Sequence, residues 1–195
     1  FNFYYDIIDV QHVDEDNGWV YVTASPDNPA QRYLYRLPVT GGAAQRVTPD
    51  DAHGSNSYQM SFDARWAVHS MSSSNQVPRT HLIRLPDHET VRVLQDNAEL
   101  QATIDRLLPS DTLFFDIPIK DNINLPAWII TPPHFDPTKQ YPLLFHVYGE
   151  PAGQTVLDRW MGKKGLWHRL LAQQGYIVAS VDNRGTPAPL GRTWR

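Results

Sequence analysis

Hydrophobic and polar residues alternate over short stretches in the first half of the chain, and polar turns separate these stretches. Alternation of this kind, rich in β-branched and aromatic residues, is typical of strands with one buried face. Turn signals such as Asn17-Gly18 and Gly41-Gly42 favour tight connections between the strands. The predicted strands are residues 5–13, 19–24, 31–37 and 46–48, followed by 53–59, 66–72, 80–85 and 90–94.

These strands fall into two units of roughly 45 residues with about four short strands each, which matches the period of β-propeller blades. Two blades cannot close a ring, so their outer strands would keep unpaired backbone groups. We therefore expect this chain to self-associate as a homo-oligomer, or to depend on partners or on further chain for its structure.

A different pattern begins near Asp96, where apolar residues recur at helical spacing over residues 97–108. A strand hairpin is predicted next, and then an apolar run, Leu143 to Val147, of the kind that forms a strand buried on both faces. A helix over 165–174 would bury Leu166, Leu170 and Leu171 and end at Gly175, before a second apolar strand. This order predicts parallel pairing of the last two strands, and so a mixed sheet. The strands of this sheet are residues 112–119, 125–131, 142–148 and 176–181.

Composition excludes several classes of function. The net charge of −4 gives no electrostatic signature for nucleic acid or an anionic membrane, so we expect neither as a partner. The absence of cysteine excludes disulfides and cysteine nucleophiles, and it is compatible with cytosol or periplasm. No apolar run approaches the ~18 residues of a membrane span. The eight histidines show no metal-binding spacing, and no nucleotide-binding glycine motif occurs, so we predict no metal and no cofactor.

The two ends of the sequence interrupt patterned segments. The chain starts inside a strand-like apolar stretch without the features of a signal peptide, and it stops at Trp194-Arg195. We therefore expect it to be a piece of a longer protein.

Tyr148 is the main candidate for chemistry. It follows the apolar run 143–147 and precedes Gly149 and Pro151, which end the strand. Reactive groups in open α/β sheets collect at the carboxyl ends of strands. The residues alone leave two interpretations open: a hydroxyl that donates to a substrate, or an aromatic ring that packs while its hydroxyl meets water.

Other polar and aromatic residues have mainly structural interpretations. Glu150 could bind a substrate amine, but a solvated loop carboxylate is the favoured interpretation. Arg184 could pair with a carboxylate at the rim of a site, although Asp182 and Arg184 more often bond loop backbone. We interpret His146 as a hydrogen-bonded core histidine rather than a base. Three further aromatic residues are expected in the core or at a domain interface: Trp160, Trp167 and Trp194.

The motifs resemble those of the prolyl oligopeptidase clan of serine peptidases, in particular its dipeptidyl peptidase IV-like branch. The resemblance covers essentially the whole chain, and its most specific part is the tyrosine–glycine–any residue–proline run after an apolar strand. It is carried by residues 20–24 and 31–36, which resemble a late propeller blade, and by 125–133, 135–137, 141–151 and 181–186, which resemble the first hydrolase strands.

The resemblance implies a β-propeller followed by an α/β-hydrolase domain, in an enzyme that releases short N-terminal peptides, often after proline. Residues 1–95 would be the last two propeller blades, and 96–195 the N-terminal part of the catalytic domain. Tyr148 would donate a hydrogen bond to the oxyanion of the tetrahedral intermediate. Many family members carry glycine at the position of Glu150, so what this carboxylate adds stays open.

The rest of the catalytic machinery is absent from the sequence. No Gly-x-Ser-x-Gly nucleophile elbow occurs, and the family's serine, acid and histidine all follow the strand that ends at Asp182. We therefore expect these 195 residues to be inactive alone. Two alternatives stay open: another branch of the clan, such as acylaminoacyl or tripeptidyl peptidases, or a non-enzymatic propeller module joined to a degenerate hydrolase half.

Overall fold

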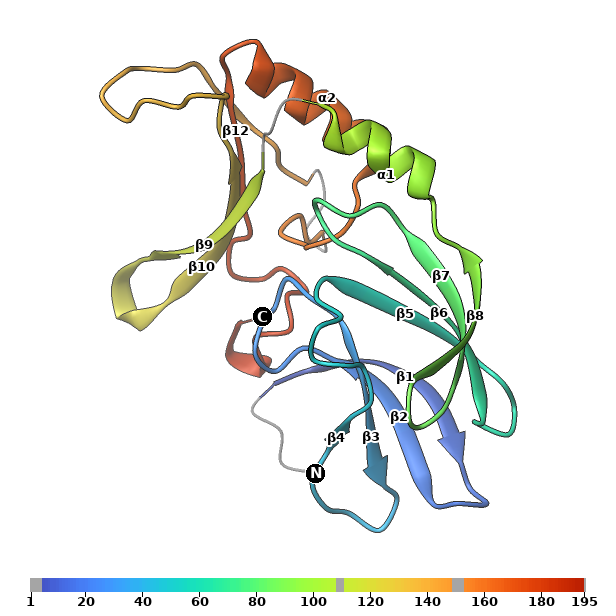
Figure 1. Cartoon of the computed structure of the whole chain (residues 1–195). Helices are drawn as coiled ribbons and strands as arrows, with labels where there is room; N and C mark the ends of the chain where they lie inside the picture. The colour runs from blue at the N-terminus through green and yellow to red at the C-terminus, as the bar shows by residue number, and fades with distance from the viewer. Residues whose placement is uncertain (1–4, 108–110, 149–152, 195) are drawn as a thin grey trace.

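The computed structural model describes residues 5–107, 111–148 and 153–194, and it is mostly antiparallel β-sheet with few helices. Twelve strands form three four-stranded sheets within this described part (Figure 1). The strands are β1 Ile7–Asp14, β2 Trp19–Ala24, β3 Tyr33–Pro38, β4 Gln45–Arg46, β5 Ser55–Met60, β6 Trp66–Ser72, β7 Arg79–Arg84, β8 Glu89–Gln95, β9 Thr112–Pro118, β10 Asn124–Ile130, β11 Leu143–Phe145 and β12 Ile177–Val181. The helices are α1 Ala98–Asp105, α2 Gly162–Gln173 and two short 3₁₀ turns, η1 Lys120–Asn122 and η2 Arg192–Trp194.

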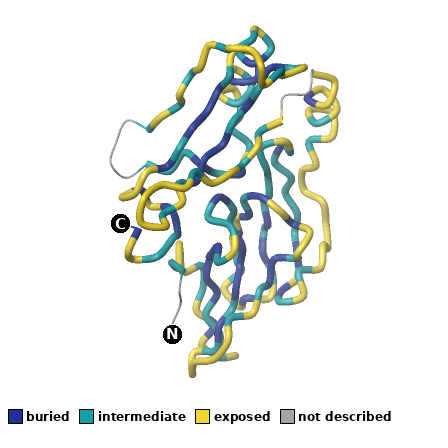
Figure 2. Tube along the Cα trace, turned by 90° about the vertical axis from the view of Figure 1, so that its left-hand side faces the viewer, coloured by how far each residue is buried: buried dark blue, intermediate teal, exposed yellow. Residues whose placement is uncertain are grey.

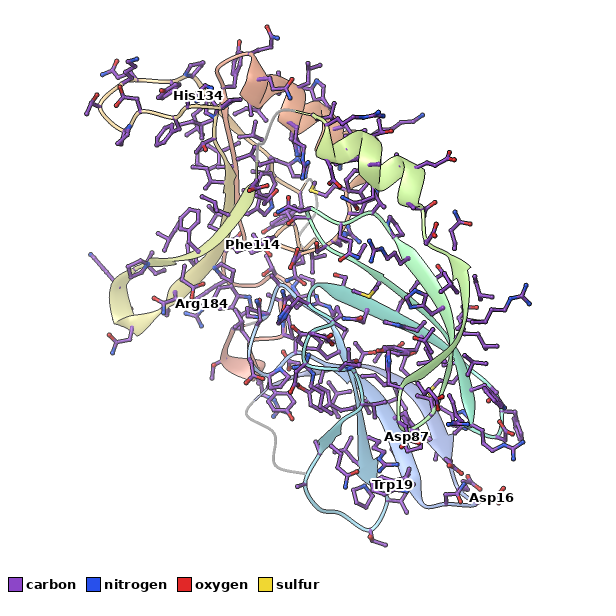
Figure 3. The ribbon with its side chains drawn as sticks, viewed as in Figure 1. Asp16, Trp19, Asp87, Phe114, His134 and Arg184 are labelled. Carbon is purple, nitrogen blue, oxygen red and sulfur yellow. The ribbon has the colours of Figure 1, made fainter. Side chains whose placement is uncertain are left out.

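The first two sheets are simple antiparallel meanders, β1-β2-β3-β4 and β5-β6-β7-β8. The two predicted units of about four strands are therefore confirmed. Local chemistry explains the turns: at the first one, Asp14 accepts hydrogen bonds from the backbone and side chain of Asn17, and Gly18 has a φ of +72°. Figure 3 shows Asp16, Trp19 and Asp87 at the same end of the two sheets.

A hydrophobic core joins these two sheets face to face. Leu34 of β3 and Ile83 of β7 are completely buried in it. Figure 2 shows that buried positions follow the inner strands, whereas the connecting loops are exposed. The other buried members of this core come from both sheets and the turns that follow them: Tyr21, Val47, Tyr58, Ala64, Ala67 and Leu85.

The third sheet has the order β11-β12-β10-β9, and α2 connects β11 to β12. β11 and β12 are parallel, with Leu143 opposite Ile177, whereas β9, β10 and β12 pair antiparallel. The predicted mixed sheet with a parallel pair is confirmed. A core forms between this sheet and α2 around Trp128, Val178 and Ala172. Figure 3 shows Phe114 of β9 on the side of the sheet that faces the two meanders.

The prediction of a strand buried on both faces at 143–147 is wrong. β11 ends at Phe145, and the side chains of Leu143, Phe145 and Val147 are 52%, 57% and 66% exposed. Leu144 points the other way and packs against the core under α2. β11 is the edge of its sheet, and the exposed side chains of Leu143 and Phe145 lie on the face opposite Leu144.

The predicted apolar face of α2 is only partly right: Leu171 packs against the core beneath the helix, but Leu170 does not. The buried residues of this helix are His168, Arg169 and Ala172, whereas Leu170 is 52% exposed. The reason is that Arg169 faces the β6–β7 loop, where its guanidinium donates to Ser74 O at 3.0 Å and to Asn75 Oδ1 at 2.7 Å. The helix begins at Gly162 rather than at residue 165.

Helix α2 ends just before Gly175, as predicted. Gly175 has a φ of +91°, which favours glycine, and its backbone N–H donates to Ala172 O at 3.0 Å. The next residue, Tyr176, donates to Leu171 O at 3.1 Å, so the last carbonyls of the helix are satisfied.

The three tryptophans take different positions. Trp194 is buried and donates its indole N–H to Thr186 Oγ1, which confirms the core prediction. Trp160 is half-buried, and its backbone N–H donates to Ser72 Oγ at the end of β6. Trp167 is 49% exposed, so its predicted burial is wrong. In the described part of the chain, no helix has the length and hydrophobicity needed to cross a bilayer.

Candidate active site

Tyr148 lies three residues beyond β11, at the edge of the sheet where β12 also ends. Beyond β11 the chain stays alongside β12 as far as His146, because the His146 backbone N–H donates to Ala179 O at 2.8 Å. Parallel pairing brings the two carboxyl ends together, so the half-buried Tyr148 faces the residues that follow β12. Its hydroxyl donates a hydrogen bond to Oδ1 of Asn183.

Gly153 lies behind the Tyr148 side chain. A Cβ atom placed on Gly153 would lie 2.6 Å from Tyr148 Cβ and 2.8 Å from Cγ, distances that real side chains do not tolerate. Glycine is therefore required here for close approach rather than for an unusual backbone conformation. The ring of Tyr148 is held between the backbone of Gly153 and the side chain of Asn183.

The loop that follows Gly153 is held by the carboxylate of Asp182. This completely buried group accepts hydrogen bonds from Thr155 N and Thr155 Oγ1, both at 2.9 Å, and from Val156 N at 3.1 Å. Thr155 Oγ1 also lies 2.7 Å from Ser180 Oγ, which donates to His146 O. One polar network therefore joins the ends of β11 and β12 to the loop that supports Tyr148.

The same loop is attached to the two meander sheets. Asp158 accepts hydrogen bonds from Gln31 Nε2 and from Ser74 N, each at 2.8 Å, which joins it to one loop from each sheet. Arg32 donates through Nη2 to Gln154 Oε1 at 2.6 Å. Burial and the nearby Arg159 lower the pKa of Arg32 to about 10, so its guanidinium stays charged at neutral pH.

A cavity of about 420 Å³ opens beside Tyr148, and its lining includes His146, Gln154 and Lys164. Burial and the neighbouring Lys164 lower the pKa of His146. His168, beneath it, has its pKa lowered to about 4 by burial and by His146 and Lys164. The rings of His146 and His168 lie 5.1 Å apart, and both contact Trp128.

His146 therefore differs from its prediction as a hydrogen-bonded core histidine. The backbone N–H and carbonyl of His146 form hydrogen bonds, while its half-buried ring lies tilted against the rings of Trp128 and His168 at the cavity. The ring is placed there because β11 is an edge strand whose end is open to solvent. Burial disfavours the charged forms of both imidazoles, so the pKa of each lies below its usual value.

Arg184 lies near Tyr148 in sequence but faces a different cavity, of about 390 Å³, together with Thr193 and Trp194. Its guanidinium donates to Thr193 O at 2.7 Å, and Figure 3 shows it near the turn end of the β9–β10 hairpin. This contact, with those of Asp182, confirms that both side chains bond loop backbone. Glu150 lies outside the described residues.

Sequence reasoning missed Asn183, Gln154 and Gly153 as residues around Tyr148. Gln154 and Gly153 are in a loop without periodicity, and Asn183 follows β12 thirty-five residues after Tyr148. The one available signal was the parallel pairing of the two strands, which places their carboxyl ends side by side.

The arrangement supplies one fixed hydrogen-bond donor at the end of a strand. A phenol fixed at a strand end can donate to an oxygen on which negative charge develops. The hydrogen bonds within the described residues join no histidine to a serine hydroxyl, so they contain no assembled nucleophile and base. The site therefore provides a donor rather than a complete catalytic group.

Comparison with known proteins gives a consistent set of relatives. A family model described as the dipeptidyl peptidase IV (DPP IV) N-terminal region matches residues 3–78. A protein named probable dipeptidyl-aminopeptidase B from Talaromyces stipitatus is 31% identical over 185 residues, which are 93% of this chain and 20% of the relative. Its namesake from Emericella nidulans is 33% identical over 177 residues, 89% of this chain and 19% of that protein.

Solved structures agree with this result. The crystal structure of Porphyromonas gingivalis dipeptidyl peptidase 4 has a TM-score of 0.89 and 28% identity, covering 100% of this chain and 27% of that one. A putative dipeptidyl aminopeptidase IV from Bacteroides ovatus, with a TM-score of 0.78 and 23% identity, shares the fold over the same shares of each chain. The chain spans about a fifth of the length of the curated relatives it matches. The resemblance predicted from the motifs is thereby confirmed: over nearly its whole length the chain is similar to proteins named dipeptidyl-aminopeptidase B and to dipeptidyl peptidase 4.

Proposed function

We propose that this chain is part of a serine exopeptidase that releases dipeptides from peptide N-termini, often after proline, through an acyl-enzyme. Residues 1–95 would be the last two blades of a β-propeller, and 96–195 the first part of an α/β-hydrolase domain that stops before the nucleophile. The peptide substrate is then a partner of the whole protein, and homo-oligomerisation belongs to the same proposal.

The observation that carries this proposal is the placement of Tyr148. Its hydroxyl projects from the end of β11 toward the residues after β12, beside an open cavity. The strand order of the third sheet, antiparallel strands followed by a parallel pair, supports the hydrolase assignment. The relatives named dipeptidyl aminopeptidases support the reaction.

In this mechanism the serine attacks the scissile carbonyl, whose oxygen becomes an oxyanion while a histidine takes the serine proton. Tyr148 donates its hydroxyl hydrogen to that oxyanion. A donor fixed in advance requires no reorganisation when charge develops, and loss of one such donor costs about 3 kcal/mol of transition-state stabilisation. The serine, acid and histidine would come from chain beyond Arg195.

The test uses the full-length protein that contains this segment, incubated with peptides that carry proline at the second position. Mass spectrometry should detect N-terminal dipeptides, and an organophosphate that acylates serine should abolish their release. The 195-residue chain alone should show no turnover. Release of tripeptides or of acylated amino acids would instead assign the protein to another branch of the clan, and absence of hydrolysis would contradict the proposal.

A further inference from the structure

The hydroxyl of Tyr148 is directed by a neighbouring strand end. Tyr148 follows β11 and Asn183 follows β12, and the phenol donates its single hydrogen to Oδ1 of the Asn183 amide. We propose that Asn183 is a positioning residue, which holds the Tyr148 hydroxyl at the sheet edge until an oxyanion replaces it as acceptor. The catalytic meaning of this inference rests on the proposed function, whereas the positioning itself does not.

The amide of Asn183 has only one suitable orientation. Its Nδ2 donates to Arg184 O at 2.7 Å, which turns Oδ1 toward the phenol. The reverse orientation would place Oδ1 against the carbonyl oxygen of Arg184, where neither atom could donate. The acceptor presented to Tyr148 is therefore an oxygen rather than an N–H group.

The backbone around Asn183 is itself fixed. Arg184 Nη2 donates to Thr193 O at 2.7 Å, and Gly185 N donates to Trp194 O at 2.9 Å. Asp182, the residue before Asn183, is completely buried and receives three hydrogen bonds from the 155–156 backbone and side chain. Asn183 projects from a strand end held on both sides, which suits a group that must fix another side chain.

The far side of the Tyr148 side chain is limited by Gly153. The close approach of Gly153 to Tyr148 Cβ leaves no room for the side chain to move backward. The ring is held from behind by backbone and at its tip by Asn183. These two contacts come from separate elements. A substitution at Gly153 and a substitution at Asn183 should therefore each shift the position of the Tyr148 hydroxyl, without the need for the other.

A neutral amide oxygen is well suited to this role. A hydrogen bond to an anion is roughly twice as strong as one between neutral groups, so a developing oxyanion can take the phenol hydrogen from Asn183. A carboxylate at position 183 would compete with the oxyanion for the same hydrogen. The inference therefore predicts that Asn183→Asp impairs catalysis more than Asn183→Ala, although aspartate has nearly the shape of asparagine.

The positioning is tested in the 195-residue chain labelled with [¹³Cζ]tyrosine, whose Cζ chemical shift reports hydrogen bonding at the phenol oxygen. Tyr148→Phe identifies one of the nine tyrosine signals. Asn183→Ala should move that signal toward the value of free tyrosine and leave the others in place, and Gly153→Ala should move it independently. The exposed Asn124→Ala is the matched control and should leave it unchanged. A Tyr148 signal that ignores Asn183→Ala overturns the inference.

Catalysis is tested separately in the full-length protein. Asn183→Ala should lower kcat by about fivefold to tenfold, the equivalent of one net hydrogen bond, with KM nearly unchanged. Asn183→Asp should lower kcat further, and Asn183→Ser should restore part of it. If the Cζ signal responds to Asn183 but Tyr148→Phe leaves kcat unchanged, the proposed function fails while the positioning stands. If Tyr148→Phe lowers kcat but neither Asn183→Ala nor Asn183→Asp does, the catalytic role of Asn183 is overturned.

Discussion

Arg32 and Gln154, separated by 122 positions in the sequence, lie in direct contact, with 2.6 Å between Arg32 Nη2 and Gln154 Oε1. The backbone of Arg32 also bridges the two meander sheets, because its N–H donates to Gly54 O and its carbonyl accepts from Asn56 N. One residue thus joins both meanders to the loop that supports Tyr148. The position of that phenol depends on contacts outside its own sheet.

Removal of the Arg32 guanidinium should destabilise the chain. Its donors satisfy Gln154 Oε1 and the carbonyls of Pro29 and Gln31 in a partly buried site. We expect Arg32→Met to lower the free energy of unfolding by about 2 kcal/mol, measured by urea denaturation. Arg65→Met is the control, because Arg65 pairs with Asp63 on the surface and its loss should cost much less than that of Arg32. Equal effects of the two variants would contradict the role of Arg32.

Asp182 should contribute more than any exposed carboxylate. Asp182→Ala would leave the N–H groups of Thr155 and Val156 without acceptors in a buried site. We expect a loss of about 3 kcal/mol, and a smaller loss for Asp182→Asn, whose Oδ1 still accepts. Thermal unfolding followed by circular dichroism measures both. An Asp182→Asn variant as unstable as Asp182→Ala would show that charge, rather than acceptor geometry, holds the loop.

Stability should fall in mild acid because of His69. This buried histidine bonds Asn56 at 2.8 Å, stacks on Tyr58, and has its pKa lowered to about 3 by burial and by His88 and His81. An unfolded histidine titrates near pH ~6.5, so protons bind the unfolded chain first as the pH falls. The stabilising contribution is complete above pH ~6.5 and is lost as the pH falls toward 3.

Between pH 7 and pH 5 this single group should remove about 2 kcal/mol from the free energy of unfolding. His69→Gln lacks the titrating imidazole. Between pH 7 and pH 5 its free energy of unfolding should therefore fall by about 2 kcal/mol less than that of the wild-type chain. Urea midpoints at the two pH values measure the difference. If the wild-type chain and His69→Gln lose equal stability, the buried neutral histidine is not the cause.

The open face of β11 should promote self-association. Phe145 and Val147 are exposed side by side along an edge strand whose backbone is unpaired on one side within the described residues. We expect the double variant Phe145→Lys and Val147→Lys to lower the apparent mass of the chain in light scattering. Phe62→Lys is the control, since Phe62 is 97% exposed but lies in a turn of the second meander. A monomeric wild-type chain would contradict this expectation.

Much of the fold could be predicted because its signals are local. Alternation and turn residues such as Asn17-Gly18 encode each meander, and the helix between two apolar strands encodes the parallel pair. Helix α2 shows the limit of this reasoning. His168 and Arg169 look polar in sequence, yet both are buried, because Trp128 and the Ser74–Asn75 loop provide their surroundings. Periodicity cannot reveal a partner from another sheet.

The residues of the candidate site also fall into those that local sequence could predict and those that it could not. Tyr148 could be identified from its own strand, because an apolar run followed by glycine and proline marks where the strand ends. Asn183 and Gly153 could not, since one depends on strand pairing and the other on a close approach that leaves no pattern in the sequence. The exposure of β11 was mispredicted because an apolar run predicts that a strand is buried, but it does not identify the element that would cover the strand.

The most direct measurement is the kcat of the full-length protein and its Tyr148→Phe variant on a dipeptidyl chromogenic substrate with proline at the second position. Phenylalanine keeps the ring beside Gly153 and removes only the hydroxyl that would donate to the oxyanion. We predict a loss in kcat of about 100-fold or more with little change in KM, as expected for a donor that acts in the transition state. An unchanged kcat would contradict the assignment of Tyr148 as the oxyanion donor.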